Sequence, residues 1–179
     1  MKLTRTILCL AAAALAVEAQ APRPRMVCLF LDVSSPDLSA QSSVRESAIQ
    51  YVQQLIAPSD IVEVMTYSSR LNVVQDFTSD QDRLIGALKT IEPATPNNVA
   101  TGSAPANDDA GHGEVQAIQG AVSSLLRFPE KKTIVYFSAG NPKGSLDSSD
   151  DIKDEVNAAM RANVAIYSVE VPNPSAQKH

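Results

Sequence analysis

The chain has 179 residues, of which 44% are hydrophobic and 20% are charged, so its composition predicts a folded domain with a core rather than a disordered chain. Fifteen Lys and Arg against 20 Asp and Glu give a formal net charge of -5, which argues against an extended basic surface for nucleic acid. Aromatic residues make up only 4% and Trp is absent, so we expect a core built mainly from aliphatic side chains.

The first segment has the pattern of a secretory signal peptide. Lys2 and Arg5 precede an aliphatic run from Ile7 to Val17, and small residues follow it. The run is too short for a permanent membrane span. We expect cleavage after Ala19, so that residues 1–19 are removed and the mature protein is secreted or periplasmic.

The two cysteines are affected differently by this cleavage. Cys9 leaves with the signal peptide, so Cys28 remains alone and an intramolecular disulfide is impossible. Cys28 lies in an apolar run, which favours a small buried hydrophobic side chain over a reactive thiol.

Strand patterns and helix patterns alternate along the rest of the chain. Apolar runs predict strands at 27–33, 61–67, 71–77, 132–138 and 164–171. Helical spacing predicts helices at 40–57, from a cap at 79 or 80 to 91, at 114–128, and from a cap at 149 or 150 to about 163. Polar loops are expected at 92–113 and 139–147. The short connection at 68–70 permits an antiparallel hairpin but no parallel crossover.

This succession predicts an α/β fold with a mostly parallel, doubly wound sheet and helices on both faces. Ligands of such sheets bind beyond the carboxyl ends of the strands, where the strand order reverses. The loops expected to carry function are therefore 34–39, 92–113 and 139–148.

At the carboxyl end of the first expected strand stands Asp32-Val33-Ser34-Ser35-Pro36. Here the chain resembles the von Willebrand factor type A domain of secreted bacterial proteins, whose first strand ends in Asp-x-Ser-x-Ser. The segments IVEVMTYSSRLNVVQDFTSD and KTIVYFSAG are similar to that family's second and third strands and to its fourth strand. The resemblance spans 26–171, followed by a polar tail at 172–179. It implies three layers, the strand order 3-2-1-4-5 with strand 3 antiparallel, and a non-enzymatic protein-interaction module for adhesion or scaffolding.

The resemblance also implies a metal-ion-dependent adhesion site for Mg²⁺, Mn²⁺ or Ca²⁺, formed in the family by two Asp, two Ser and one Thr. Asp32 and Ser34 match two of these positions and are the ligands we expect if a cation binds. Pro36 stands at the second Ser position and Ala139 at the second Asp position, and no Thr directly precedes the third helix. We therefore expect the site to be incomplete or absent.

Other groups near these loops offer substitute ligands for a cation. They are Ser35, Asp108, Asp109, His112, Glu114 and Asn141. Thr95 and Thr101 are present in the middle loop, but neither directly precedes the helix, so the family's Thr cannot be assigned to either. The competing interpretation of Asp32 is that its carboxylate caps its own loop or the next helix through backbone N–H groups. For Asp108 and Asp109, a solvated loop is the competing interpretation.

The sequence supports an enzyme less well than an interaction module. Neither G-x-x-x-x-G-K-[ST] nor G-x-G-x-x-G is present. The alternative to an interaction module is a small secreted serine hydrolase using Ser34 or Ser138 as nucleophile with His112 as base. Tyr136, however, stands where the nucleophile elbow G-x-S-x-G has its first glycine. A third class is a structural part of a larger envelope assembly.

The last expected strand, 164–171, carries Ser168 and Glu170 on one face, which predicts an edge strand. The family generally continues with a further helix and strand, whereas this sequence ends within ten residues. We expect the open edge to pair with a protein partner or with a second copy, which would give a homodimer.

Overall fold

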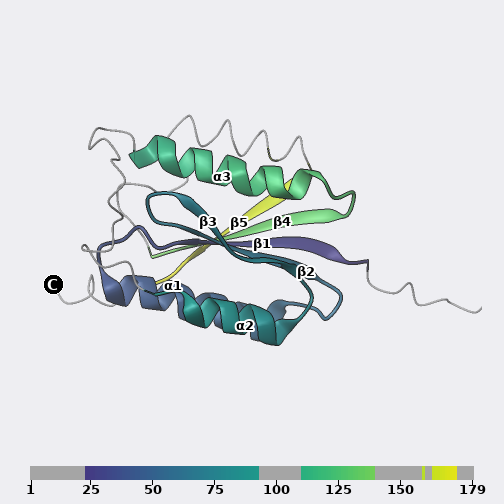
Figure 1. The fold of residues 1–179 in the computed structure, drawn as a ribbon, viewed down its shortest axis with the longest axis horizontal. Helices are drawn as coiled ribbons and strands as arrows, with labels where there is room; N and C mark the ends of the chain where they lie inside the picture. Colours follow the sequence, from purple (N-terminus) through teal and green to yellow (C-terminus); the bar gives the residue numbers. More distant parts are fainter. Residues whose placement is uncertain (1–22, 93–109, 140–158, 160–162, 173–179) are drawn as a thin grey trace, which may run out of the picture.

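The computed structural model describes residues 23–92, 110–139, 159 and 163–172. Within these ranges the chain forms one five-stranded sheet with helices on both faces (Figure 1). The expected signal peptide at 1–19, the last expected helix except residue 159, and most of the tail at 172–179 lie outside the described residues. None of the helices described is long and apolar enough to cross a membrane.

The elements follow one another in the expected order. The strands are β1 (Arg25–Asp32), β2 (Ile61–Tyr67), β3 (Leu71–Thr78), β4 (Lys131–Ser138) and β5 (Val164–Glu170). The helices are α1 (Leu38–Leu55), α2 (Gln81–Thr90) and α3 (Ala110–Leu126). The sheet has the order β3-β2-β1-β4-β5, and β3 is its only antiparallel strand among those described. The expected strand order and the edge position of the last strand are confirmed.

The sheet forms the middle of three layers, with α1 and α2 on one face and α3 on the other (Figure 1). Alternate residues of β1 therefore enter two separate cores. Val27, Leu29 and Leu31 pack on the side of α1 and α2, while Cys28 and Phe30 pack on the side of α3. Because both faces are covered, the strand is an uninterrupted apolar run. Cys28 is fully buried, as its sequence surroundings predict.

Two helices differ from the expected bounds at their starts. The helix expected at 40–57 begins at Leu38, because the carboxylate of Asp37 accepts a hydrogen bond from the N–H of Ser39 and caps the helix. The helix expected to begin at Glu114 begins at Ala110, so the expected loop at 92–113 is shorter than its polar composition indicates. The expected cap at Asp80 is confirmed, since it accepts a hydrogen bond from the N–H of Arg83.

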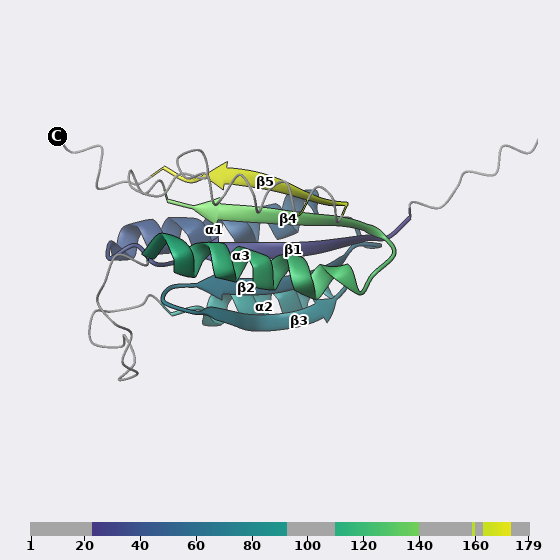
Figure 2. The same ribbon diagram turned by 90° about the horizontal axis from the view of Figure 1, so that it is seen from above.

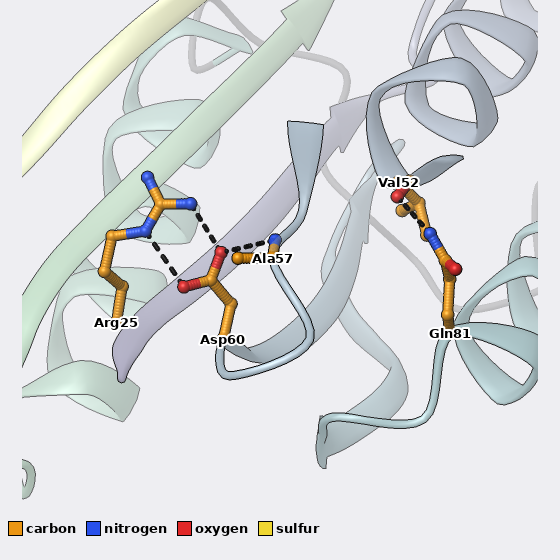
Figure 3. A network of polar contacts seen from close by, with 5 residues as sticks. All are labelled: Arg25, Val52, Ala57, Asp60 and Gln81. Carbon is orange, nitrogen blue, oxygen red and sulfur yellow. Dashed lines mark hydrogen bonds and ion pairs between the residues drawn. The ribbon is translucent and has the colours of Figure 1, made fainter. Parts of the chain in front are cut away.

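At the amino end of β1, an ion pair fixes the strand to the turn before β2. The guanidinium of Arg25 binds both carboxylate oxygens of Asp60, which also accepts a 2.9 Å hydrogen bond from the N–H of Ala57 (Figure 3). Nearby, the side-chain amide of Gln81 donates to the carbonyl of Val52, 2.6 Å away, and so ties the start of α2 to α1. The loop between β1 and α1 lies at the opposite, carboxyl end of β1.

Candidate functional site

The site begins with Asp32, the last residue of β1. Its Oδ1 accepts a 2.9 Å hydrogen bond from the backbone N–H of Ser34. The N–H of Val33 donates to the carbonyl of Tyr67, 2.8 Å away, and holds the loop against the end of β2. Asp32 thus stabilises the turn that follows it, as the loop-capping interpretation of this residue predicts.

A tyrosine from β4 joins Asp32 to a second carboxylate. The hydroxyl of Tyr136 lies 2.6 Å from Oε1 of Glu114, on α3, and 3.4 Å from Oδ2 of Asp32. The shorter contact is a charge-assisted hydrogen bond from the phenol to the carboxylate. Residues from β1, β4 and α3 that are far apart in sequence therefore form one polar network, which we call the Asp32–Tyr136–Glu114 network.

Burial and mutual charge shift the protonation of this network. Burial raises the pKa of Glu114, and the neighbouring charge of Asp32 raises it further against the opposing hydrogen bond from Tyr136. Burial also raises the pKa of Tyr136, with the charges of Asp32 and Glu114 acting in the same direction. Tyr136 therefore stays neutral. When Glu114 takes up a proton, it can donate to the phenol oxygen, and the phenol can then donate to Asp32.

Aromatic rings form the inner wall of the site. Phe30 stacks between Tyr136 and Tyr67, with ring centroids 5.4 Å and 6.5 Å away. A Cβ atom at Gly113 would lie 2.7 Å from the hydroxyl oxygen of Tyr67, so a side chain there would force Tyr67 or the start of α3 to shift. Gly113 thereby places the next residue, Glu114, within reach of Tyr136.

The rim of the site is the loop between β1 and α1. Ser34, Pro36 and Leu38 are exposed, and Leu38 keeps 45% of its surface accessible. The loop is held from within, because the carbonyl of Ser35 accepts a 2.6 Å hydrogen bond from the side chain of Gln41. We call the exposed surface of Ser34, Pro36 and Leu38 the rim.

The structure brings some of the sequence-predicted residues together. The N–H of Ser34 donates to Asp32, and Glu114 reaches the same Tyr136 hydroxyl as Asp32 from the first turns of α3 rather than from a loop. Ser138, at the end of β4, uses its carbonyl to accept from the N–H of Val171. In the ranges described, the hydroxyls of Ser34 and Ser138 have no hydrogen bond to a base. The expected residues Thr95, Thr101, Asp108, Asp109 and Asn141, and the side chain of His112, lie outside the described part.

The oxygen donors among the described residues at this end of the sheet fit a divalent cation poorly. A hard cation such as Mg²⁺ or Ca²⁺ takes six or more oxygen ligands. Pro36 and Ala139 supply no side-chain oxygen, and both carboxylate oxygens of Asp32 already face a hydrogen-bond donor. Among the residues whose placement is described, no three His, Cys, Asp or Glu side chains are grouped as metal ligands.

Sequence reasoning missed the two tyrosines and Gly113. A signal for the tyrosines is present, because Tyr67 ends β2 and Tyr136 lies two residues before the end of β4, and these buried strands flank β1 on both sides. Their pairing with Asp32 and Phe30 places them at the carboxyl end of the sheet. The role of Gly113 depends on how closely α3 approaches β2, which no local pattern records.

Comparison with solved structures gives matches to bacterial proteins. An aerotolerance-related membrane protein from Bacteroides fragilis aligns at 17% identity with a TM-score of 0.59, over 82% of this chain and 67% of that protein. BatB from Bacteroides thetaiotaomicron aligns at 15% identity with a TM-score of 0.56, over 83% of this chain and 66% of BatB. The vWF domain of the pilus tip protein Mfa5 from Porphyromonas gingivalis aligns at 15% identity with a TM-score of 0.48, over 66% of this chain and 38% of that chain.

The sheet order β3-β2-β1-β4-β5 with an antiparallel β3 is the one that the sequence resemblance implies, and the solved structures share the fold. The chain has a von Willebrand factor type A-like fold. It spans about two thirds of the length of the two Bacteroides proteins. No protein-family model matches the sequence, and a comparison with curated proteins finds no match. At these sequence identities the similarity shows the fold alone. The activity has to be inferred from the residues of this chain.

Proposed function

We propose that this von Willebrand type A-like chain is a secreted, non-enzymatic protein-interaction module that uses the rim as its docking surface. The observation that carries the proposal is the Asp32–Tyr136–Glu114 network beneath the rim. The network occupies the carboxyl end of the sheet, where ligands of this fold class bind. Both oxygens of Asp32 and Oε1 of Glu114 face protein donors, which supports docking at the rim without a divalent cation.

The rim has the chemistry of a small docking surface. Exposed apolar groups of Pro36 and Leu38 lie beside the hydroxyl of Ser34. The loop is fixed by Asp32 and Gln41 before any partner arrives, which lowers the entropy lost on binding. A partner is therefore expected to present a complementary apolar side chain with a hydrogen-bonding group next to it.

The expected export from the cytoplasm rests on the signal-like segment 1–19. The aerotolerance-related structure with the same fold is described as a membrane protein, which agrees with a role at or beyond the membrane. Among the described strands β5 lies at an edge of the sheet, and this edge offers a second docking mode, in which a second copy pairs with it to form a homodimer. Light scattering at high protein concentration tests this mode, and a monomer there excludes it.

Two exposed leucines of α1 allow a matched test of the rim. Leu38 lies at the start of α1 and Leu55, 60% exposed, lies at its end. In a crosslinking capture from the extracellular fraction of the source cells, Leu38→Asp is expected to lose the partner that the wild type and Leu55→Asp retain. Equal capture by both variants contradicts docking at the rim.

The independence from cations is tested by thermal melts with and without excess Mg²⁺, Mn²⁺ or Ca²⁺. We expect the same Tm in each condition. A rise in Tm that Asp32→Ala or Ser34→Ala abolishes would assign the metal site to those two residues and contradict this part of the proposal. Labelling by a serine-reactive phosphonate, lost on His112→Ala, would instead favour the hydrolase.

A further inference from the structure

A cavity lies on the side of the sheet opposite α3. None of the rim residues is among its lining residues. Its volume is about 300 Å³. Its lining comes from β1, α1, β4 and β5, and consists of Arg25, Tyr51, Lys131, Thr133, Val135, Tyr167 and Val169. β5 is an edge strand of the described sheet (Figure 2), and 58% of Tyr167 is exposed, so the described residues leave this part of the sheet face accessible to solvent.

Arg25 presents a fixed donor to this cavity. Its Nε and Nη2 bind Asp60, while the third guanidinium nitrogen is turned away from that carboxylate (Figure 3). Within the described ranges, this Nη1 makes no hydrogen bond. Because Asp60 is itself held by the N–H of Ala57, the guanidinium is oriented before any ligand arrives. Electrostatic interactions with Tyr51 and Tyr167 place both phenols near the same group.

A second cation stands beside Arg25. Lys131 is its register partner across the β1–β4 pair and is exposed, and it has no ion pair with any residue that the structure describes. None of the described residues that line the cavity is acidic. The charge of Arg25 is balanced by Asp60, so among the described residues the cavity carries one uncompensated positive charge, that of Lys131.

The other end of the cavity is apolar. Val135 lies four residues beyond Lys131 on β4, about 13 Å away along an extended strand. It is the register partner of Tyr167, and Val169 follows on the same face of β5. Thr133, between the two ends, adds one hydroxyl. The lining therefore runs from cationic at the amino ends of the strands to apolar toward their carboxyl ends.

We infer that this cavity binds a small amphipathic carboxylate, with its carboxylate at Lys131 and Nη1 of Arg25 and its apolar part against Val135, Tyr167 and Val169. One carboxylate matches the single uncompensated charge and the two neighbouring donors. The volume lies at the lower end of the range for small-molecule pockets, which selects a small ligand. This site is separate from the proposed docking at the rim, and either can fail without the other.

Two-dimensional NMR of the full mature chain tests the site with hexanoate and with hexanamide, its uncharged counterpart of nearly equal shape. Hexanoate is expected to shift the backbone amides of Thr133 and Tyr167 saturably, with a millimolar Kd. Hexanamide is expected to bind at least about fivefold more weakly, because it lacks the charge that Lys131 and Arg25 recognise.

Lys131→Gln is the decisive variant, because Lys131 is exposed and Arg25 is needed to pair with Asp60. It is expected to remove the preference for hexanoate over hexanamide. Lys89→Gln, at an exposed lysine of α2, is expected to preserve it. Tyr167→Ala is expected to weaken both ligands alike. Absence of a saturable shift, equal affinity for the two ligands in the wild type, or an unchanged preference in Lys131→Gln overturns the inference.

Discussion

Oε2 of Glu63, on β2, accepts a 2.8 Å hydrogen bond from the hydroxyl of Ser124, on α3. Glu63 is only 3% exposed, so a carboxylate lies between the sheet and the helix that covers it. Burial raises the pKa of Glu63, and the charge of Asp76 adds to this against the opposing effects of Ser124 and Arg127. The charged form is therefore unfavourable in the folded state.

Glu63→Gln is expected to stabilise the protein at neutral pH, by about 1 kcal/mol, because the amide keeps a partner for Ser124 without a buried charge. Since the folded-state pKa of Glu63 lies above its ordinary value of 4.5, the folded state binds the proton more readily. The wild type thus gains stability as the pH falls from the raised pKa toward 4.5. Urea unfolding at several pH values should show the variant's advantage shrinking over that window. An advantage that does not change with pH contradicts the assignment.

Tyr136→Phe removes the hydroxyl that donates to Glu114 and so breaks the link between that carboxylate and Asp32. We expect a loss of about 2 kcal/mol in the free energy of unfolding, because a half-buried charge loses its donor. The loss should be smaller below the raised pKa of Glu114, where that group is neutral. Urea unfolding followed by circular dichroism measures both effects. Tyr167→Phe, at an exposed tyrosine without such a bond, serves as control and should change little.

Asp60→Asn breaks the ion pair with Arg25 and is expected to cost about 2 kcal/mol of stability at neutral pH. Burial alone would raise the pKa of Asp60, but the hydrogen bonds and charge of Arg25 and the N–H of Ala57 hold it below its ordinary value of 3.8. Its stabilising contribution is therefore complete above that ordinary value and is lost as the pH falls through the lower folded-state pKa. Urea midpoints of wild type and variant should converge in acid. Asp76→Asn, at a largely exposed residue of a long ion pair, should have almost no effect.

Two glycines in helices are expected to respond in opposite ways to alanine. Gly86 in α2 has no atom within 4 Å of an added Cβ, so Gly86→Ala should stabilise by up to about 1 kcal/mol through helix propensity. Gly113→Ala places its Cβ 2.7 Å from the hydroxyl of buried Tyr67 and should destabilise by about 1–3 kcal/mol. Thermal melts compare the two variants. A stabilising Gly113→Ala would show that α3 can move away from β2 at no cost.

The fold was predictable because each buried strand carries its own signal. Apolar runs such as Val27–Leu31 need helices on both faces, and the three-residue link between β2 and β3 forces an antiparallel hairpin. Helix starts were less predictable. Asp37 caps α1 earlier than the apolar stripe begins, and α3 includes Gly111 and Gly113, which resemble loop residues in the sequence.

The candidate site was only half predictable. The position of Asp32 at the end of β1 followed from the sequence motif, whereas its contact with Tyr136 depends on the alignment of β1 with β4. The approach of Glu114 depends on the packing of α3, which is permitted by the absence of a side chain at Gly113. Such contacts arise between distant segments, and local periodicity carries no information about them.

The two outer strands of the sheet differ in regularity. β2 and β3 pair with register shifts between Val62 and Val64 and between Val64 and Met65, whereas β4 and β5 pair without interruption from Lys132 to Ser138. An irregular edge strand such as β3 is a poor template for a further strand, whereas a regular edge strand such as β5 is a good one. If two copies paired through their β5 edges, only the irregular β3 edges would remain, and strand addition would stop. The product would be a dimer and not an open filament.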